Sequence, residues 1–518
     1  MTVTATPPPG RLARHGPFLA VLGSAMLLRF VLAYVAYPGQ GFASDINQFA
    51  HWANVLAADG PSSFYQSSGA NYPPGYMYVL WFLGALGSWL GPVLGISTGE
   101  ATLQLLKLPA ILADGVIGIL LYRAGGSWFG RSAGLVAAAL YLFLPVSWYD
   151  SALWGQVDAV GSLLMLAALL ALADGWSEPS LAFAVAGVLV KPQDAVCLVV
   201  VLPVLLRRHL LRIGSGPRPS LGPRMSRLND RLRGPLTHQG PLRLVSTLAV
   251  GAIVGIVPLL PFDIQTFASP DLQGDLVVGH VAGLVGLFGS VTDQFSVLTA
   301  NAFNAWSLVG PTPLTTVASS GSGAWTLDSM TVLWGLSAMQ LGAALLGIVG
   351  LTVAGGLLLR DDRTAILLGF AVVAFAFYAV PTRVHERYLF ALWPVGALLA
   401  CRFGAGAAGY IATALLNTVN LHAILGSSHE IGGPPGGYGG FGGGLGRVSG
   451  GWPGNGGGTS VGGGASWISL PFVDVARSEP VLIAVAVGQT LAFIALFAIW
   501  VAVAFGPSLR RLWRRLRT

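Results

Sequence analysis

The stretch VLIAVAVGQTLAFIALFAIWVAVAF occupies residues 481–505 and contains no charged side chain. About 20 consecutive apolar residues in a helix are enough to cross the hydrocarbon core of a bilayer. Five arginines follow directly: Arg510, Arg511, Arg514, Arg515 and Arg517. An apolar run that ends in a basic tail predicts a transmembrane helix whose end faces the cytoplasm.

The composition of the whole chain also predicts that it lies in a lipid bilayer. Of 518 residues, 54% are apolar and only 9% are charged, and the mean hydropathy is +0.69. Soluble domains carry about 25% charged residues, so a soluble protein is excluded. The two cysteines, Cys197 and Cys401, both lie within apolar runs, which excludes a disulfide scaffold. We therefore expect an integral membrane protein.

Eleven further apolar stretches are candidate spans, some of them short. They cover residues 18–37, 103–122, 132–147, 159–173, 181–191, 195–206, 244–262, 332–359, 365–381, 388–401 and 405–425. The fold class expected is all-α: a polytopic membrane protein of about 12 transmembrane helices, with external juxtamembrane helices. Residues 73–96 are also apolar, but they are rich in proline and glycine. We expect them to lie along the interface or dip into it.

The arginines support this topology. Nine of them lie between residues 207 and 243. If residues 73–96 do not span, this loop faces the cytoplasm together with both chain ends, as basic loops prefer. Arg29 lies within the first span, where a charge either faces a polar cavity or snorkels to the interface.

The expected organisation has four parts. Residues 1–17 form a cytoplasmic tail. Residues 18–425 form the transmembrane domain, with a first external loop at 38–102 and a basic cytoplasmic loop at 207–243, of which 214–241 are expected to be disordered or surface-bound. Residues 426–478 form a Gly-rich external loop, expected to be a flexible tether because glycine buries little surface. Residues 479–518 form the last span and its basic tail.

Polar residues gather where spans are expected to end externally. Asp45 lies in the first external loop, where helical spacing begins. One interpretation is that Ser44 or Asp45 caps this helix. The other is that Asp45 is a carboxylate that accepts a proton from a substrate hydroxyl. Further along the same loop, Tyr72 precedes two prolines and suits a membrane interface.

A second cluster runs from Trp148 to Asp158. It holds the acids Asp150 and Asp158, the amide Gln156, and aromatic residues that include Trp154. Aromatic faces stack on sugar C–H groups, so this cluster is a candidate sugar-binding surface. The alternative is a polar cap with interfacial aromatics.

Cations also occur on the external side of the membrane, where the distribution of arginines predicts few basic residues. Lys191 is one of only two lysines, and an anionic head group, a phosphate or a simple acid partner would explain its position. Arg383, His385 and Arg387 form the third cluster. His385-Glu386 begins like the zinc motif HExxH, but position 389 is leucine, so that motif fails. Two arginines around a histidine suit a phosphate or pyrophosphate.

These motifs resemble the integral-membrane glycosyltransferases of the GT-C type, and among them the bacterial relatives of the second mannosyltransferase of GPI-anchor assembly. The most specific are Trp154-Gly155-Gln156-Val157-Asp158 and His385-Glu386-Arg387-Tyr388. The resemblance covers roughly residues 18–425, which makes this part the catalytic domain.

The resemblance implies an inverting transfer of a sugar from a polyprenyl-phosphate donor, with mannose as the default sugar. It makes Asp45 the general base and either Asp150 or Asp158 a second functional acid; Trp154, Gln156 and Tyr72 would help to bind the acceptor or the sugar. Lys191, Arg383, His385 and Arg387 would stabilise the phosphate.

No cofactor and no divalent metal are expected. The partners expected are the lipid bilayer, the lipid-linked donor, and a glycolipid, polysaccharide or protein acceptor, with the active site on the external face of the cytoplasmic membrane and no role for nucleic acid.

Three other functions stay open at this point. A polyprenol-linked oligosaccharide polymerase or ligase shares the same leaving group. A membrane transporter or flippase fits the number of spans and their intramembrane charges. A scaffold that uses the Gly-rich loop is the third.

Overall fold

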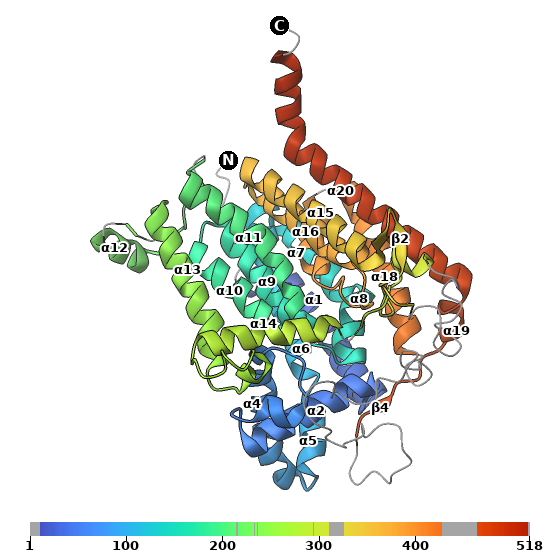
Figure 1. Cartoon of the computed structure of the whole chain (residues 1–518). Coiled ribbons are helices and arrows are strands. Elements are labelled where there is room, and N and C mark those ends of the chain that lie inside the picture. Colours follow the sequence, from blue (N-terminus) through green and yellow to red (C-terminus); the bar gives the residue numbers. More distant parts are fainter. Residues whose placement is uncertain are drawn as a thin grey trace, which may run out of the picture.

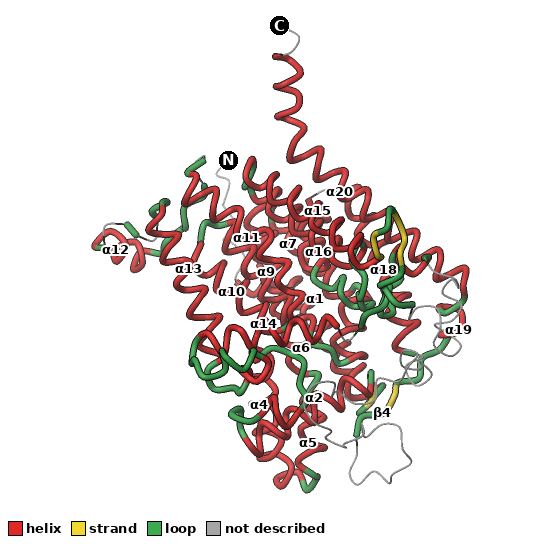
Figure 2. The backbone as a smooth tube through the Cα atoms, in the orientation of Figure 1, coloured by secondary structure: helices red, strands yellow, loops and turns green. Residues whose placement is uncertain are grey.

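The computed structural model describes residues 11–213, 216–232, 234–235, 237–293, 295–309, 326–402, 404–426 and 464–515. Helices make up nearly all of its regular structure (Figures 1 and 2). The two sheets of the described part have two short strands each. The expected all-α class is confirmed.

The elements follow one another along the chain in three groups. Up to the second cluster they are α1 (Arg11–Val31), η1 (Leu32–Ala36), β1 (Gln40–Gly41), α2 (Ala43–Asp59), α3 (Phe64–Ser68), α4 (Pro74–Leu94), α5 (Thr98–Leu105), α6 (Leu108–Phe129), α7 (Arg131–Phe143), α8 (Pro145–Trp148) and η2 (Tyr149–Trp154). The middle group is α9 (Asp158–Ala173), α10 (Ser177–Val190), η3 (Pro192–Cys197), α11 (Leu198–Leu205), η4 (Leu206–Leu211), α12 (Pro223–Arg231), α13 (Pro241–Ile256), η5 (Val257–Leu259), η6 (Ile264–Phe267), α14 (Val278–Asp293) and η7 (Ala305–Leu308). The last group is β2 (Thr331–Leu333), β3 (Leu336–Ser337), α15 (Ala338–Leu359), α16 (Arg363–Ala379), α17 (Leu392–Arg402), α18 (Gly404–Leu425), β4 (Ser466–Trp467), α19 (Val473–Ala476) and α20 (Glu479–Arg515).

The helices long enough to cross a membrane are fewer than the 12 or so spans expected. Within the described residues, seven helices are long and apolar enough to cross a membrane, and the bent pair Arg131–Phe143 and Pro145–Trp154 makes up to eight. Five shorter apolar helices accompany them: Asp158–Ala173, Ser177–Val190, Val278–Asp293, Arg363–Ala379 and Leu392–Arg402. The chain is thus a multi-pass membrane protein.

Arginines from distant loops gather at one end of the bundle, which we call the arginine end. Arg207 and Arg208, both in η4, bind Asp361 at 3.0 and 2.7 Å. Arg363, at the start of α16, binds Asp174 at 3.0 Å. The end of α20 points away on this side in Figure 1. The common location agrees with the topology expected from the arginine count; that this end faces the cytoplasm stays a prediction.

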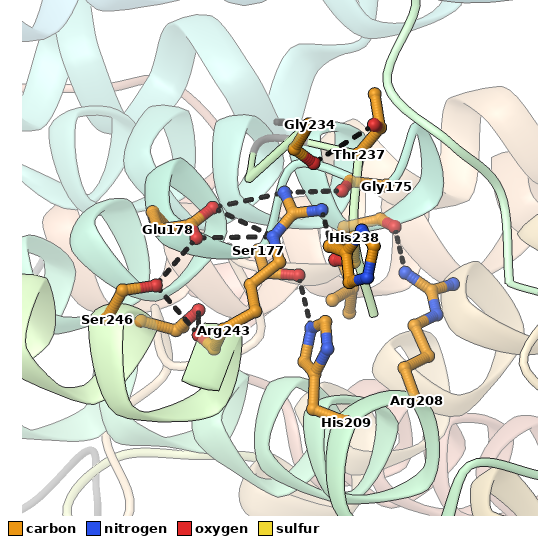
Figure 3. A network of polar contacts seen from close by, with 12 residues as sticks. Gly175, Ser177, Glu178, Arg208, His209, Gly234, Thr237, His238, Arg243 and Ser246 are labelled. Atoms are coloured by element: carbon orange, nitrogen blue, oxygen red, sulfur yellow. Dashed lines mark hydrogen bonds and ion pairs between the residues drawn. The ribbon is translucent and has the colours of Figure 1, made fainter. Parts of the chain in front are cut away.

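A polar network fastens α10, η4 and α13 to one another at the arginine end (Figure 3). Arg243 binds Glu178 at 3.1 Å, and Nε2 of His209 lies 2.8 Å from the hydroxyl of Ser177. Burial, followed by the charge of Arg243, lowers the pKa of His209 to about 4. His209 is therefore neutral at physiological pH and holds its place through neutral hydrogen bonds.

Arg29 neither snorkels nor faces solvent. It is fully buried, and its Nε binds Asp114 of α6 at 2.7 Å. The same carboxylate accepts hydrogen bonds from Tyr141 and Ser151, and Ser147 accepts one from Arg29. The buried charge is thus compensated in the way that an apolar interior requires, and it joins α1, α6 and the turn after α7.

Helices α2, α4 and α5 form a separate group at the lower edge of Figure 1. Such helices were expected in the first external loop. Helix α4 is long and apolar enough to cross a membrane. Nevertheless it packs against α2 and α5, where Gly84 and Gly87 meet Ala53 and Thr102 so closely that a Cβ would clash. That α4 lies at the interface stays a prediction.

Two helices depart from the expected pattern. Helix α14 lies in the long segment after residue 262, where no helix was expected. Helix α12 occupies the middle of residues 214–241, so this part of the loop is helical and not disordered as one alternative held. Its high arginine content concealed the helical spacing of Met225, Leu228 and Leu232. Most of the Gly-rich loop, residues 427–463, lies outside the described residues.

Candidate functional site

The site is built from three loops at the end of the bundle opposite the arginine end. Residues 155–158 lead into α9, residues 191–193 follow α10, and residues 380–391 join α16 to α17. Each of these helices has its other end at the arginine end. The first turn of α2, which carries Asp45, completes the cluster. The three sequence clusters, which are up to 340 residues apart, therefore meet in space.

Asp45 does not cap its helix. Helix α2 begins at Ala43 with Phe42 as its N-cap residue, and no side chain makes a capping hydrogen bond. The capping interpretation is wrong, because the helix starts two residues before Asp45. Instead, Oδ2 of Asp45 accepts hydrogen bonds from Nε1 of Trp154, at 2.9 Å, and from the amide of Gln156. These two hydrogen bonds hold the carboxylate in place. Because Asp45 is only half-buried, the carboxylate is still accessible.

The turn around Gly155 brings these two donors together. The π-helix η2 ends at Gly155, whose φ of +86° is a left-handed conformation that suits glycine. The turn reverses the chain so that Trp154 and Gln156 both reach Asp45. The ring of Trp154 stacks on Phe42, with centroids 4.6 Å apart. This packing covers one face of the indole, while its edge donates the hydrogen bond to Asp45.

Lys191 is buried and lies at the centre of the cluster. Its ammonium donates to Asp158 at 2.7 Å and to Oε1 of Gln156 at 3.1 Å. It also lies 5.5 Å from the ring centre of Tyr72. Burial alone would lower the pKa of Lys191, but the negative charge of Asp158 outweighs it and raises the pKa above its ordinary value. Lys191 therefore stays positively charged.

Arg387 is the second cation of the cluster. It binds Glu386 at 2.8 Å and approaches Asp158 to 3.9 Å. Its guanidinium lies 5.6 Å from the ring centre of Trp154, which places it near the indole that binds Asp45. Its Nε is buried and has no hydrogen-bond partner among the described residues. An anion at this point would supply the partner.

Tyr72 forms one wall of the cluster. Its backbone carbonyl accepts a hydrogen bond of 2.8 Å from the hydroxyl of Tyr65. Burial raises the pKa of Tyr72, although the charges of Lys191 and Arg387 oppose this effect. The phenol is therefore neutral and is a potential donor to a ligand oxygen.

Arg383 is placed outside the cluster, although it lies four residues before Arg387. Its guanidinium binds Asp328 at 2.7 Å and Asp293 at 3.1 Å. These contacts fasten the loop after α16 to the end of α14 and to the segment before β2. The structure therefore gives Arg383 a role in holding the loop, which the motif alone did not reveal.

His385 lies close to the cluster but does not contribute a positive charge. Burial, followed by the charges of Arg387 and Lys191, lowers its pKa well below the ordinary value. Its ring packs edge-on against Phe295, with centroids 4.6 Å apart. A neutral imidazole is a hydrogen-bonding group and not a phosphate-binding cation.

The two candidate acids occupy different positions. Asp158 contacts both cations of the cluster, whereas neither carboxylate oxygen of Asp150 has a hydrogen-bond partner among the described residues. Asp150 is fully buried, and its backbone carbonyl accepts from the amides of Gly155 and Gln156. The geometry thus assigns Asp158 to the charged cluster and Asp150 to its support.

Three residues of the site were not among those expected. Glu386 binds Arg387, Gln193 donates to Asp158 at 3.3 Å, and Asp194 is buried beside them. Burial, together with the charge of Asp158, raises the pKa of Asp194 well above its ordinary value. Glu386 lies within the motif His385-Glu386-Arg387-Tyr388, and Gln193 and Asp194 closely follow Lys191. The available signal was polarity inside an apolar surrounding.

A small cavity opens beside the cations. It is lined by Asp158, Ser162, Gln193, Asp194, Val196, Ala374, Phe377, Arg387, Tyr388, Phe390 and Ala391. Among the described residues, no group of three or more His, Cys, Asp or Glu side chains converges as a metal site. Independence from metal stays a prediction.

No protein-family model matches the chain, and no curated protein matches it in sequence. Solved structures match it at low sequence identity and low TM-score. One is ArnT from Cupriavidus metallidurans bound to undecaprenyl phosphate, with 14% identity, 96% of this chain and 78% of that chain covered, and a TM-score of 0.41. Another is the archaeal oligosaccharyltransferase AglB from Archaeoglobus fulgidus, in complex with an inhibitory peptide and a dolichol-phosphate. Its identity is 13%, its TM-score is 0.40, and the match covers 94% of this chain and 56% of that one.

Proposed function

We propose that this chain is a membrane glycosyltransferase of the GT-C type. It transfers a sugar, with mannose as the first candidate, from a polyprenyl-phosphate donor to a hydroxyl of a lipid or another cell-envelope molecule. The reaction inverts the anomeric carbon and takes place on the external side of the cytoplasmic membrane. The observation that carries the proposal is that the half-buried carboxylate of Asp45 shares its two hydrogen-bond donors with the two cations. Gln156 also binds Lys191, and the ring of Trp154 also lies beside Arg387.

The arrangement suits the charge changes of this reaction. Asp45 takes the proton from the acceptor hydroxyl while the oxygen of that hydroxyl bonds to the anomeric carbon. The bond between that carbon and the phosphate oxygen breaks, and the phosphate leaves with the electron pair. Lys191 and Arg387 stabilise the negative charge that develops on it. Because a monoester phosphate needs no proton to leave, cations serve this step better than an acid.

The position of the cluster favours transfer over transport. Its residues come from loops at one end of the bundle and from the first turn of α2, and not from the middle of spans. Transporters place their substrate sites near the midplane of the membrane. A site at the end of the bundle leaves the lipid tail of the donor in the bilayer and admits a polar acceptor from the aqueous side.

The test is sugar transfer in proteoliposomes with a panel of polyprenyl-phosphate sugars and a native lipid extract as acceptor. Wild type is compared with Asp45→Asn and with the control Asp59→Asn, an exposed acid at the far end of the same helix. We expect transfer by wild type and by Asp59→Asn, and none by Asp45→Asn despite intact donor binding. Movement of a lipid-linked sugar across the bilayer without a new glycosidic bond would replace the proposal by a flippase.

A further inference from the structure

The chain returns from the Gly-rich loop to the first external loop. Residues 464–468, which we call the returning segment, contain β4, and β4 pairs in parallel with β1. The amide of Ser466 donates to the carbonyl of Gly39 at 3.0 Å, and that of Ile468 donates to Gly41 at 3.2 Å. The strand that directly precedes α2 therefore depends on a segment more than 420 residues away.

The returning segment also holds the first turns of α2. The amide side chain of Asn47 accepts from the backbone N–H of Ala465 at 2.7 Å and donates to its carbonyl at 3.3 Å. Asn47 lies two residues after Asp45 on the same helix. This pair of bonds restrains the helix end that carries the carboxylate.

An aromatic series continues from the segment to Asp45. The ring of Trp467 packs edge-on against Phe42, with centroids 5.1 Å apart and an interplanar angle of 86°. Phe42 stacks on Trp154, whose indole binds Asp45. At Gly41 a Cβ would come within 2.8 to 2.9 Å of the carbonyl oxygens of residues 153 and 154. Strand β1 is thus held tightly between the returning segment and the turn that carries Trp154.

We propose that the returning segment is a positioning element for the catalytic base, with Trp467 as its main contact. The inference rests on the proposed function, because it takes Asp45 as the base. A base must lie within about half an ångström of its productive position, and a displacement of about 1 Å costs about 100-fold in rate. The described end of the Gly-rich loop, residues 464–468, then has a role beyond that of a tether.

The first experiment separates positioning from folding and from donor binding. Trp467→Ala removes the contact to Phe42, and Trp467→Phe keeps an aromatic edge there. Trp334→Ala is the matched control, because Trp334 is 88% exposed in the turn between β2 and β3. We expect Trp467→Ala to lower kcat at least tenfold with an unchanged KM for the donor. Trp467→Phe should keep most of the wild-type kcat, and the control should match wild type. Wild-type kcat in Trp467→Ala, or an effect on the donor KM alone, would overturn the proposal.

The second experiment tests the docking itself. Gln40 and Ser466 are partners across the two strands, so Gln40→Cys with Ser466→Cys is expected to form a disulfide under mild oxidation. Cys197 and Cys401 are replaced by alanine in this variant, and the linked peptides are identified by mass spectrometry. The oxidised enzyme is expected to keep its transfer rate. A failure to form the disulfide, or a loss of activity that reduction restores, would overturn the proposal, because the segment would be absent or would have to leave during turnover.

The two proposals fail in different ways. If wild type transfers no sugar from any donor, the proposed function falls and the positioning role falls with it, even if the disulfide forms. If wild type is active and the disulfide does not form, only the positioning role falls.

Discussion

The indole Nε1–H of Trp154 donates a hydrogen bond of 2.9 Å to Oδ2 of Asp45, across 109 residues of chain. This bond links the first external loop to the turn before α9. Gln156 donates to the same oxygen, so both side-chain donors bind Oδ2.

Replacement of Trp154 by phenylalanine keeps the stack on Phe42 but removes the donor. A hydrogen bond to a charged group is worth about 1.5–3 kcal/mol. We expect kcat to fall about tenfold to 100-fold while the protein stays folded, measured as sugar transfer beside thermal unfolding in detergent. Trp128→Phe, at the arginine end, serves as the control, and equal rates for Trp154→Phe and wild type would show that this bond does not orient the base.

The neighbouring arginines of the third cluster are expected to have separate roles. Arg387→Ala removes a cation that contacts Asp158 and Glu386 in the site, so kcat/KM should fall at least 100-fold. Arg383→Ala removes the cation that binds Asp328 and leaves this acid with the hydroxyl of Thr382, so the unfolding temperature should fall while the folded enzyme keeps most of its kcat. Activity per folded molecule distinguishes the two, and the reverse pattern would assign the phosphate to Arg383.

Lys191 and Asp158 form a buried pair whose single members are expected to be costly to remove. Deleting one partner of a buried ion pair destabilises a protein by about 3–5 kcal/mol. We expect Lys191→Met to reduce both stability and donor binding. The double variant Lys191→Met/Asp158→Leu should recover stability but not transfer, because it restores charge balance without restoring a cation. Recovery of transfer would remove Lys191 from the mechanism.

Arg29 and Asp114 provide the same test away from the site. Both side chains are fully buried. Arg29→Met alone should lower the unfolding temperature strongly, and Arg29→Met/Asp114→Leu should recover part of the loss. Tyr141 and Ser151 lose their acceptor in the double variant, so recovery is expected to be incomplete. Full tolerance of the single change would contradict a structural role for this pair.

His209 is expected to make stability depend on pH. Its pKa is lowered to about 4 in the folded protein, from an ordinary value of about 6.5. Between these values the unfolded chain binds a proton that the folded chain does not, so its stabilising effect is complete above about pH 6.5 and declines as the pH falls toward 4.

The matched variant for this test is His209→Gln, which keeps a side chain able to bond Ser177 and the amide of Gly240. Thermal unfolding of both proteins from pH 7.5 to 4.5 should show a smaller decline for the variant. Parallel curves would mean that other groups account for the acid sensitivity.

Much of the site was visible before the structure. Asp45, Gln156, Asp158, Lys191 and Arg387 were selected as polar side chains in an apolar chain, and Trp154 as an aromatic residue that can stack on a sugar. The exclusion of Arg383 and the neutrality of His385 were not visible, because the acids beside Arg383 lie 55 and 90 residues away in sequence and burial has no local signature. The choice between Asp150 and Asp158 also needed the positions of both cations.

An integral membrane protein, its apolar helices and the gathering of its arginines on one side could all be predicted from the chain's residues. These follow from local composition, since each span must satisfy its backbone internally and each charge must reach water or a partner. The folded chain was needed to show which polar residues meet, that Asp45 is held by Trp154 instead of capping α2, and that residues 464–468 return to the first loop. Such contacts depend on the packing of helices that are distant in the chain, and no local pattern encodes that packing.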